Sequence, residues 1–208
     1  FFVCLYCHGR LAATKPDPSR LTGFYILVSL GGALGALIGS VLVPLVLKGD
    51  FELPLTLAAI AVAIAWAHRR DRPLSRIATG LLALVVVAVA MGQIVRAVRE
   101  ARLLTRNFYS ALRIVDTTDV STPYRTMEHG SVEHGTQYLD PARRREPLSY
   151  YSATSGVALA LKRQRELAAG GPLAIGIIGL GAGALAAYGE PGDRFRFYEL
   201  NPQVIRIC

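Results

Sequence analysis

The sequence Leu173-Ala-Ile-Gly-Ile-Ile-Gly-Leu-Gly-Ala-Gly183 carries the clearest fold signal in this chain of 208 residues. Its first six residues form a continuous apolar run of strand length, which is typical of a strand covered on both faces. Three glycines at alternate positions follow and allow the backbone to turn sharply. A short helix (184–188), a turn (189–193) and a second strand (194–199) are expected next. This order predicts a βαβ unit of an α/β Rossmann-like domain.

Glu199 ends the second expected strand, twenty residues after Gly179. In a nucleotide-binding βαβ unit the glycine turn brings backbone N–H groups close to the ligand, and the acid accepts hydrogen bonds from ribose hydroxyls. Gly179, Gly181, Gly183 and Glu199 are therefore candidate cofactor-binding residues. The alternative is a glycine-rich turn that binds no ligand.

The identity of the cofactor depends on how the glycines are grouped. With Ala184, the first two glycines also fit the dinucleotide fingerprint. The spacing G-x-G-x-G instead fits folds of the S-adenosylmethionine methyltransferase type. The tail Tyr198-Glu-Leu-Asn-Pro202 is similar to the E-[IL]-[DN]-P string that closes the second strand in aminopropyltransferases and many methyltransferases. We therefore favour a sulfonium nucleoside, and residues 150–208 are expected to form the first part of this domain.

Residues 1–95 have the composition of a membrane region, because they hold nearly all of the long apolar runs and few acidic residues. Residues 1–20 are expected to contain the tail of a preceding helix and a basic loop. An α-helical transmembrane region with about three segments should follow over residues 21–95. The expected segments are 21–47, 51–67 and 77–95.

The net charge of +8 does not predict nucleic-acid binding. The basic residues crowd beside the apolar runs, as in Arg69–Arg76, which fits lipid headgroups and makes the bilayer the expected partner. No aromatic and basic platform or recognition helix accompanies the charge. The basic loops 8–20 and 68–76 and the basic stretch 96–106 favour opposite topologies. We expect the soluble part to be cytoplasmic because nucleoside cofactors are found there.

Residues 96–149 are expected to form a linker and a β-hairpin subdomain. The basic stretch 96–106 is predicted to be helical, and the β-formers of 107–115 predict a strand. Residues 124–128 and 133–139 predict a hairpin around His129-Gly130-Ser131. A polar loop (140–149) and a helix (155–166) should connect the hairpin to the glycine-containing unit.

Two sets of potential metal or haem ligands have simpler explanations. Cys4-Leu-Tyr-Cys-His8 matches the haem-attachment string, but it ends an apolar stretch, so we interpret the cysteines as buried apolar thiols. His129 and His134 lie in the expected hairpin without a third ligand nearby. No metal is therefore expected.

Several strings together resemble the bacterial membrane-fused spermidine synthase-like family. They extend along most of the chain: Cys7-His-Gly-Arg-Leu-Ala12, Phe24-Tyr25, the glycine-rich 29–39, Asn107-Phe-Tyr109, His129-Gly130, His134-Gly-Thr-Gln137, Tyr150-Tyr151 and 179–183. The resemblance implies a multi-helix region of the bacterial inner membrane, then a β-hairpin subdomain and a Rossmann-like core.

The resemblance also implies roles for individual residues. Glu199 would bind the ribose of decarboxylated S-adenosylmethionine or of S-adenosylmethionine. Gln137 would contact the cofactor, and Tyr150 the polyamine or other amine substrate. The chain departs from the family pattern where His129 replaces the usual aspartate of the hairpin and where Tyr151 replaces an acidic residue.

The implied activity is aminopropyl transfer in polyamine biosynthesis by a membrane-anchored spermidine synthase-like enzyme. The catalytic carboxylates of that family follow later strands and are expected beyond Cys208, so the chain is interpreted as a fragment, cut at both ends and inactive alone. Two alternatives remain open: an S-adenosylmethionine-dependent methyltransferase-like enzyme, and a non-catalytic transporter or sensor that binds a nucleoside or a polyamine. A homo-oligomer is compatible with the sequence.

Overall fold

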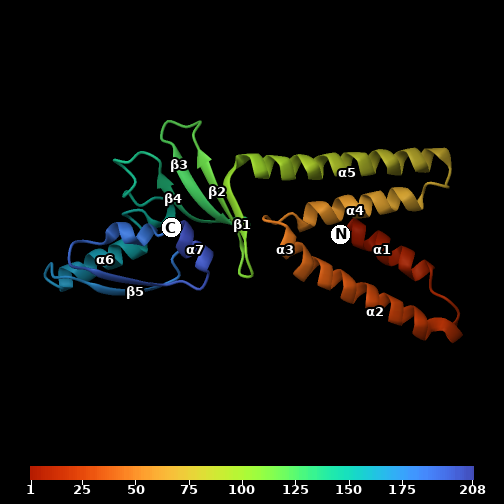
Figure 1. Ribbon diagram of the computed structural model, residues 1–208, viewed down its shortest axis with the longest axis horizontal. Helices are drawn as coiled ribbons and strands as arrows, with labels where there is room; N and C mark the ends of the chain where they lie inside the picture. The colour runs from red at the N-terminus through yellow and green to blue at the C-terminus, as the bar shows by residue number, and fades with distance from the viewer. The chain divides into compact units, whose positions relative to one another are not determined.

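A computed structural model describes residues 1–208, which divide into two compact units, Phe1–Arg96 and Ala97–Cys208 (Figure 1). The first unit is helical. The second begins with a four-stranded antiparallel sheet and ends with a pair of parallel strands. Each unit is described by itself below.

The helical unit contains two helices that are long and apolar enough to cross a membrane, as judged by length and composition: Pro18–Val46 and Pro73–Glu100. The first consists of a 3₁₀ turn, α2 (Leu21–Leu37), a π-helical turn and α3 (Val43–Val46), and the second is α5. Helix α4 (Glu52–Ala67) has 16 residues, or about 24 Å at 1.5 Å per residue, which is shorter than a bilayer core of about 30 Å.

Helix α1 (Phe2–Ala13) corrects the prediction for the first twenty residues. The expected basic loop from residue 8 begins only at Thr14, because the helix continues through Arg10. Helix α1 meets the end of α4 where the Tyr6 hydroxyl lies 3.4 Å from His68 Nδ1. Cys4 and Cys7 on α1 are exposed free thiols, so the prediction that they are buried is wrong.

Pro44 explains the π-helical turn at Ile38–Leu42. Proline has no N–H for the carbonyl one turn earlier, and its ring clashes with that carbonyl. The chain accommodates it with a wider turn, in which the Val43 N–H donates to the Ile38 carbonyl five residues back. The helix therefore continues through the proline instead of ending there.

The antiparallel sheet has the order β1-β2-β3-β4. Its strands are β1 (Ala101–Arg106), β2 (Ala111–Thr117), β3 (Tyr124–His129) and β4 (Val132–Tyr138). The hairpin predicted around residues 129–131 is confirmed as β3 and β4.

Two predictions before that hairpin are wrong. The basic stretch 96–106 is helical only to Glu100 and then becomes β1, because pairing with β2 satisfies its backbone groups. The predicted strand 107–115 begins only at Ala111. Asn107 makes a turn first: its side-chain oxygen accepts hydrogen bonds from the N–H groups of Tyr109 (3.0 Å) and Ser110 (3.2 Å).

The parallel strands are β5 (Ala174–Ile178) and β6 (Arg194–Tyr198), as predicted. Helix α6 (Gly156–Leu167) is confirmed, with the Ser155 hydroxyl as its N-terminal cap. The link between the strands is a 3₁₀ turn (Ala184–Tyr188), and α7 (Pro202–Ile207) follows β6.

The prediction that β5 is covered on both faces is wrong for this chain. Ile175 and Ile177 are half-buried, but Ile178 on the other face is 95% exposed. The buried cluster lies instead where the antiparallel sheet meets α7. It consists of Leu112, Ile114, Met127 and Val204, with Leu180, Ala182 and Ile207 packed against it.

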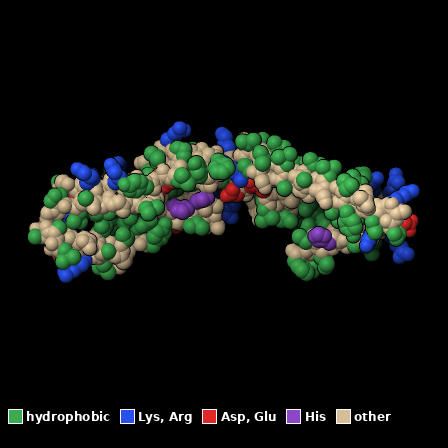
Figure 2. Space-filling view, turned by 90° about the horizontal axis from the view of Figure 1, so that it is seen from below, with side chains coloured by type: hydrophobic (Ala, Val, Ile, Leu, Met, Phe, Trp, Pro, Cys, Tyr) green, Lys and Arg blue, Asp and Glu red, His purple; other side chains and the backbone are tan.

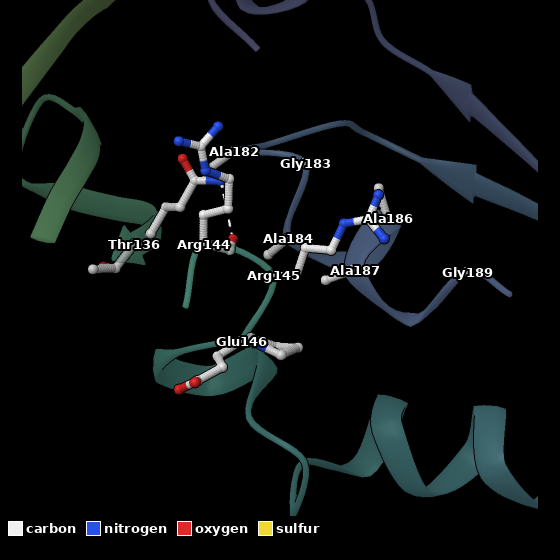
Figure 3. Close-up of a pocket in the computed structure, with 12 residues that line it drawn as sticks. Thr136, Arg144, Arg145, Glu146, Ala182, Gly183, Ala184, Ala186, Ala187 and Gly189 are labelled. Carbon is white, nitrogen blue, oxygen red and sulfur yellow. Dashed lines mark hydrogen bonds between the residues drawn. The ribbon is translucent and has the colours of Figure 1, made fainter. Parts of the chain in front are cut away.

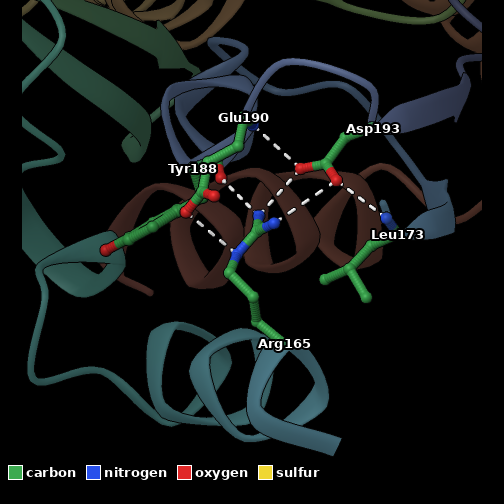
Figure 4. Close-up of polar contacts among 5 residues, drawn as sticks. All are labelled: Arg165, Leu173, Tyr188, Glu190 and Asp193. Carbon is green, nitrogen blue, oxygen red and sulfur yellow. Dashed lines mark hydrogen bonds and ion pairs between the residues drawn. The ribbon is translucent and has the colours of Figure 1, made fainter. Parts of the chain in front are cut away.

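An ion-paired joint holds α6 to the parallel strands (Figure 4). The Arg165 guanidinium lies 2.8 Å from the Asp193 carboxylate, which is only 2% exposed. That carboxylate also accepts hydrogen bonds from the N–H groups of Leu173 (2.7 Å) and Glu190 (2.8 Å). The joint therefore connects α6 with the residues that precede β5 and β6.

Candidate functional site

The glycine turn needs glycine at three positions. Gly179, Gly181 and Gly183 have φ angles of 87°, 57° and 74°, in the left-handed region that side-chain-bearing residues rarely adopt. The Gly179 N–H donates to the Tyr198 carbonyl (2.8 Å), and the Gly183 N–H donates to the Leu180 carbonyl (3.0 Å). The turn is thus fixed to the end of β6 and closed on itself.

Glu199 is joined to this turn by hydrogen bonds. One carboxylate oxygen accepts from the Leu180 N–H (2.9 Å) and the other from the Asn201 N–H (2.7 Å). Burial alone would raise the pKa of Glu199, but hydrogen bonds from the backbone of Asn201, Leu180 and Leu200 bring it below its ordinary value. The group is therefore ionised at neutral pH. The carboxylate has about four lone-pair positions, so it keeps acceptor capacity that a ligand hydroxyl can use.

Asn201 connects the site to the antiparallel sheet. It is buried, and its side-chain oxygen accepts from Asn107 Nδ2 (2.7 Å) and from the Gln203 N–H (3.0 Å). Its amide donates to the Ser110 hydroxyl (3.1 Å). The sequence marks Asn201 only as part of the tail after Glu199. An asparagine directly before Pro202 is a signal for the start of a helix, and it identifies this residue as the cap of α7.

The hairpin touches the glycine turn at Gly135. A Cβ at this position would lie 2.6 Å from the Ala182 Cβ, closer than two carbons can approach. A Cβ on Gly181 would lie 3.2 Å from the His134 carbonyl oxygen. The absence of side chains on these glycines therefore lets β4 and the turn pack together.

The first of two hollows at the turn, the Glu199 hollow, has a volume of about 340 Å³. It is lined by Tyr109, Ser110, Leu112, Met127, His129, His134, Gly179, Gly181, Glu199, Leu200, Asn201 and Val204. The rings of His129 and His134 stack with centroids 5.4 Å apart. Burial and the neighbouring His129 lower the pKa of His134, and Glu199 opposes this. His134 is therefore neutral at pH 7.

The second hollow, the Arg144 hollow, also has a volume of about 340 Å³ (Figure 3). It is lined by Thr136, Gln137, Arg144, Arg145, Glu146, Pro147, Ala182, Gly183, Ala184, Ala186, Ala187 and Gly189. His134 lines the first hollow and Thr136 the second, so the contact between Gly135 and Ala182 lies between them.

The structure thus divides the residues that the sequence predicted as one site. Gly179, Gly181 and Glu199 line the Glu199 hollow, whereas Gly183 and Gln137 line the Arg144 hollow. The Gln137 amide donates to the Arg144 carbonyl (3.2 Å). Arg144 and Arg145 were not among the predicted site residues, because an arginine run in a polar loop does not reveal what it faces.

Tyr150 lies among the lining residues of neither hollow. Its hydroxyl donates to the Glu133 carbonyl (3.1 Å), and its ring lies 4.5 Å from that of Tyr151. Burial raises the pKa of Tyr150, and the neighbouring Tyr151 adds to the shift. In the structure Tyr150 thus connects the hairpin to the loop that follows it.

No protein-family model, curated protein or solved structure matches this chain. The structure also contains no group of three or more His, Cys, Asp or Glu side chains arranged to hold a metal ion. The chemistry of the site therefore follows from its own residues. An ionised carboxylate beside a glycine turn can accept hydrogen bonds from a ligand, and two arginines nearby can bind an anion.

Proposed function

We propose that this chain is part of a membrane-anchored transferase that binds a sulfonium nucleoside, S-adenosylmethionine or its decarboxylated form, in a Rossmann-like domain. The observation that carries the proposal is the Glu199 carboxylate at the edge of a hollow, held ionised by the backbone N–H groups of Leu180 in the glycine turn and of Asn201. An ionised carboxylate only accepts hydrogen bonds, so it suits a pair of ribose hydroxyls.

The rest of the Glu199 hollow supports a nucleoside. Tyr109, which is 46% exposed, offers an aromatic ring for a base, and the buried Leu112 and Met127 make part of the lining apolar. The Asn201 amide is occupied by Asn107, Ser110 and Gln203, so it positions the site and leaves ligand binding to Glu199.

The proposed anchor is the helical unit. Large apolar side chains such as Leu27 and Leu84 are exposed along its two long helices, and Figure 2 shows hydrophobic side chains gathered over the helices. In hydrocarbon such a surface costs nothing, whereas in water it would favour aggregation. Lipid is therefore the proposed partner of this unit. We propose the bacterial inner membrane, with the nucleoside-binding unit in the cytoplasm.

The proposed reaction is displacement at a carbon bonded to the sulfonium. An amine nitrogen forms the new N–C bond, the C–S bond breaks with its electron pair going to sulfur, and the product is a neutral thioether. The amine also loses a proton to a base. Glu199 is a poor base because backbone N–H groups bind both of its oxygens. Aminopropyl transfer to a polyamine uses the decarboxylated nucleoside, and methyl transfer uses the intact one.

Isothermal titration of the protein in detergent tests the class of ligand. The panel contains S-adenosylmethionine, its decarboxylated form, methylthioadenosine and a nicotinamide dinucleotide. We expect all three sulfur nucleosides to bind and the dinucleotide to bind more weakly. Tighter binding of the dinucleotide, or no binding of any sulfur nucleoside, contradicts the proposal.

A further inference from the structure

We infer that the Arg144 hollow is an anion subsite that holds the carboxylate of the nucleoside's amino-acid tail, so that the site prefers intact S-adenosylmethionine to its decarboxylated form. This inference rests on the proposed function, because it extends the same ligand from the Glu199 hollow. It assigns to Arg144 and Arg145 a role that the pattern of the sequence did not suggest.

The three arginines at residues 143–145 differ in whether an acidic side chain neutralises their charge. Arg143 forms an ion pair with Glu146, with 2.7 Å between the closest atoms, and lies 3.9 Å over the Tyr138 ring. The Glu146 carboxylate is thereby used, and the ion pair holds the pKa of Glu146 below its ordinary value. Arg144 and Arg145 make no ion pair in the structure, so two positive charges remain without a counter-ion.

Both uncompensated arginines lie beside the glycine turn. In Figure 3 the Arg144 side chain points toward Ala182 and the Arg145 side chain toward Ala186, while the Glu146 carboxylate points away from these residues. The other lining residues near the turn are alanines and glycines, whose small side chains leave the hollow open. A ligand atom can therefore approach a guanidinium and the turn together.

The two hollows share one short peptide. Gly179 and Gly181 line the Glu199 hollow, and 182–184 line the Arg144 hollow. The inference requires the tail of a nucleoside with its ribose at Glu199 to follow this peptide around the contact of Gly135 with Ala182. The tail then ends on the side where the two guanidinium groups lie.

The sign of the charge discriminates between the two nucleosides. Guanidinium groups bind carboxylates and phosphates in a planar, two-point arrangement. The tail of S-adenosylmethionine ends in a carbon that bears both a carboxylate and an ammonium group. The decarboxylated tail keeps only the ammonium group, which two arginines repel without any carboxylate to offset it. A cationic polyamine is disfavoured in this hollow for the same reason. The inference therefore favours methyl-type transfer from the intact nucleoside over aminopropyl transfer.

The test combines Arg144→Gln with Arg145→Gln and titrates the same ligands. Losing charge-assisted hydrogen bonds should weaken binding of S-adenosylmethionine by about tenfold or more. Binding of methylthioadenosine, which lacks the tail, should not change. Arg163→Gln, an exposed arginine on α6 that pairs with Glu166, is the matched control and should bind every ligand as the unmodified protein does.

Each contrary outcome identifies what fails. Unchanged affinity for S-adenosylmethionine in the double variant, with methylthioadenosine still bound, overturns the subsite and leaves the proposed function intact. Failure of every sulfur nucleoside to bind the unmodified protein overturns the proposed function itself. If the double variant loses affinity only for the dinucleotide, the subsite binds phosphate, and the inference that it binds a carboxylate is wrong. Both arginines are exposed, so the double variant should unfold at the same temperature as the unmodified protein. Added salt should weaken the binding of S-adenosylmethionine more than the binding of methylthioadenosine.

Discussion

Glu199 and Gly135 each contact a different residue of the glycine turn. Glu199 accepts the Leu180 N–H, and Gly135 lets β4 lie against Ala182. A ligand-binding carboxylate that also fixes the backbone of its own site needs little rearrangement when ligand arrives. Pre-organisation at this residue is thus part of how the site would bind a nucleoside.

Gly135→Ala should separate the hairpin from the turn. The added Cβ would lie 2.6 Å from that of Ala182, and overpacking of this kind costs about 1–3 kcal/mol. The φ angle of 152° at Gly135 adds backbone strain to any side chain there. We expect a lower midpoint of thermal unfolding, measured by circular dichroism in detergent. The control is Gly156→Ala at the start of α6, where nothing lies within 4 Å of the added Cβ. Equal stability of the two variants contradicts the proposed contact.

At the scale of single residues, the sequence predicts the site residues of the glycine turn better than the residues that contact the turn. The three turn glycines and Glu199 follow a spacing that reflects local backbone geometry, and all but Gly183 line one hollow. Gly135, Arg144 and Asn201 act through residues distant in sequence, and a local pattern carries no information about such contacts. Tyr150 shows the reverse case: the resemblance implied that it contacts the amine substrate, but it lines neither hollow.

Among the elements, α6 depends on the Arg165–Asp193 joint. Hydrogen bonding to Arg165, followed by the N–H groups of Leu173 and Glu190, lowers the pKa of Asp193 far below its ordinary value of 3.8. A carboxyl whose pKa is lowered by folding stabilises the fold above its unfolded-state pKa. That contribution is lost as the pH falls through the folded-state value.

Asp193→Asn should therefore destabilise the fold at pH 7. As the pH falls below about 3.8, the variant should lose less stability than the unmodified protein. The measurement is the midpoint of thermal unfolding as a function of pH. Asp119→Asn, an exposed carboxyl in the loop before β3, serves as the control and should leave the profile unchanged. A pH profile that Asp193→Asn leaves unaltered would show that the joint does not contribute.

The elements were predictable where apolar and turn patterns are strong, as in the hairpin, α6 and the parallel strands. The boundary at Glu100 was not, because the basic and aliphatic residues that follow suit a helix or a strand equally well. Pairing with β2 decides the outcome, and that pairing is tertiary. The exposed face of β5 was not predicted for a similar reason. An apolar run indicates that a strand is suited to burial, but it does not indicate which elements cover the strand.

For the whole molecule, the two units differ in the solvent they suit. The helical unit exposes apolar side chains along two long helices, and the other unit gathers its buried cluster around Leu112. The composition changes near residue 95, and the first compact unit ends at Arg96. Composition is averaged over many residues, so a division based on it does not depend on where a single helix ends.

Leu82→Arg should oppose membrane insertion of α5. An arginine at the centre of a spanning helix costs about 2.5–3.5 kcal/mol on insertion scales. We expect a shift of this size in the apparent free energy of insertion, measured with a glycosylation reporter. Val120→Arg, in an exposed loop of the other unit, is the control. Equal insertion of both variants contradicts a membrane-spanning role for α5.

The most direct test of the account is the affinity of S-adenosylmethionine for Glu199→Gln, measured by isothermal titration in detergent. Glutamine has a similar shape but lacks the charge and one acceptor oxygen, so we expect binding about tenfold weaker. The control is Glu166→Gln, an exposed carboxylate on α6 that lines neither hollow. It should bind as tightly as the unmodified protein. Equal affinity of Glu199→Gln and the control would contradict the role of Glu199 as the ribose acceptor.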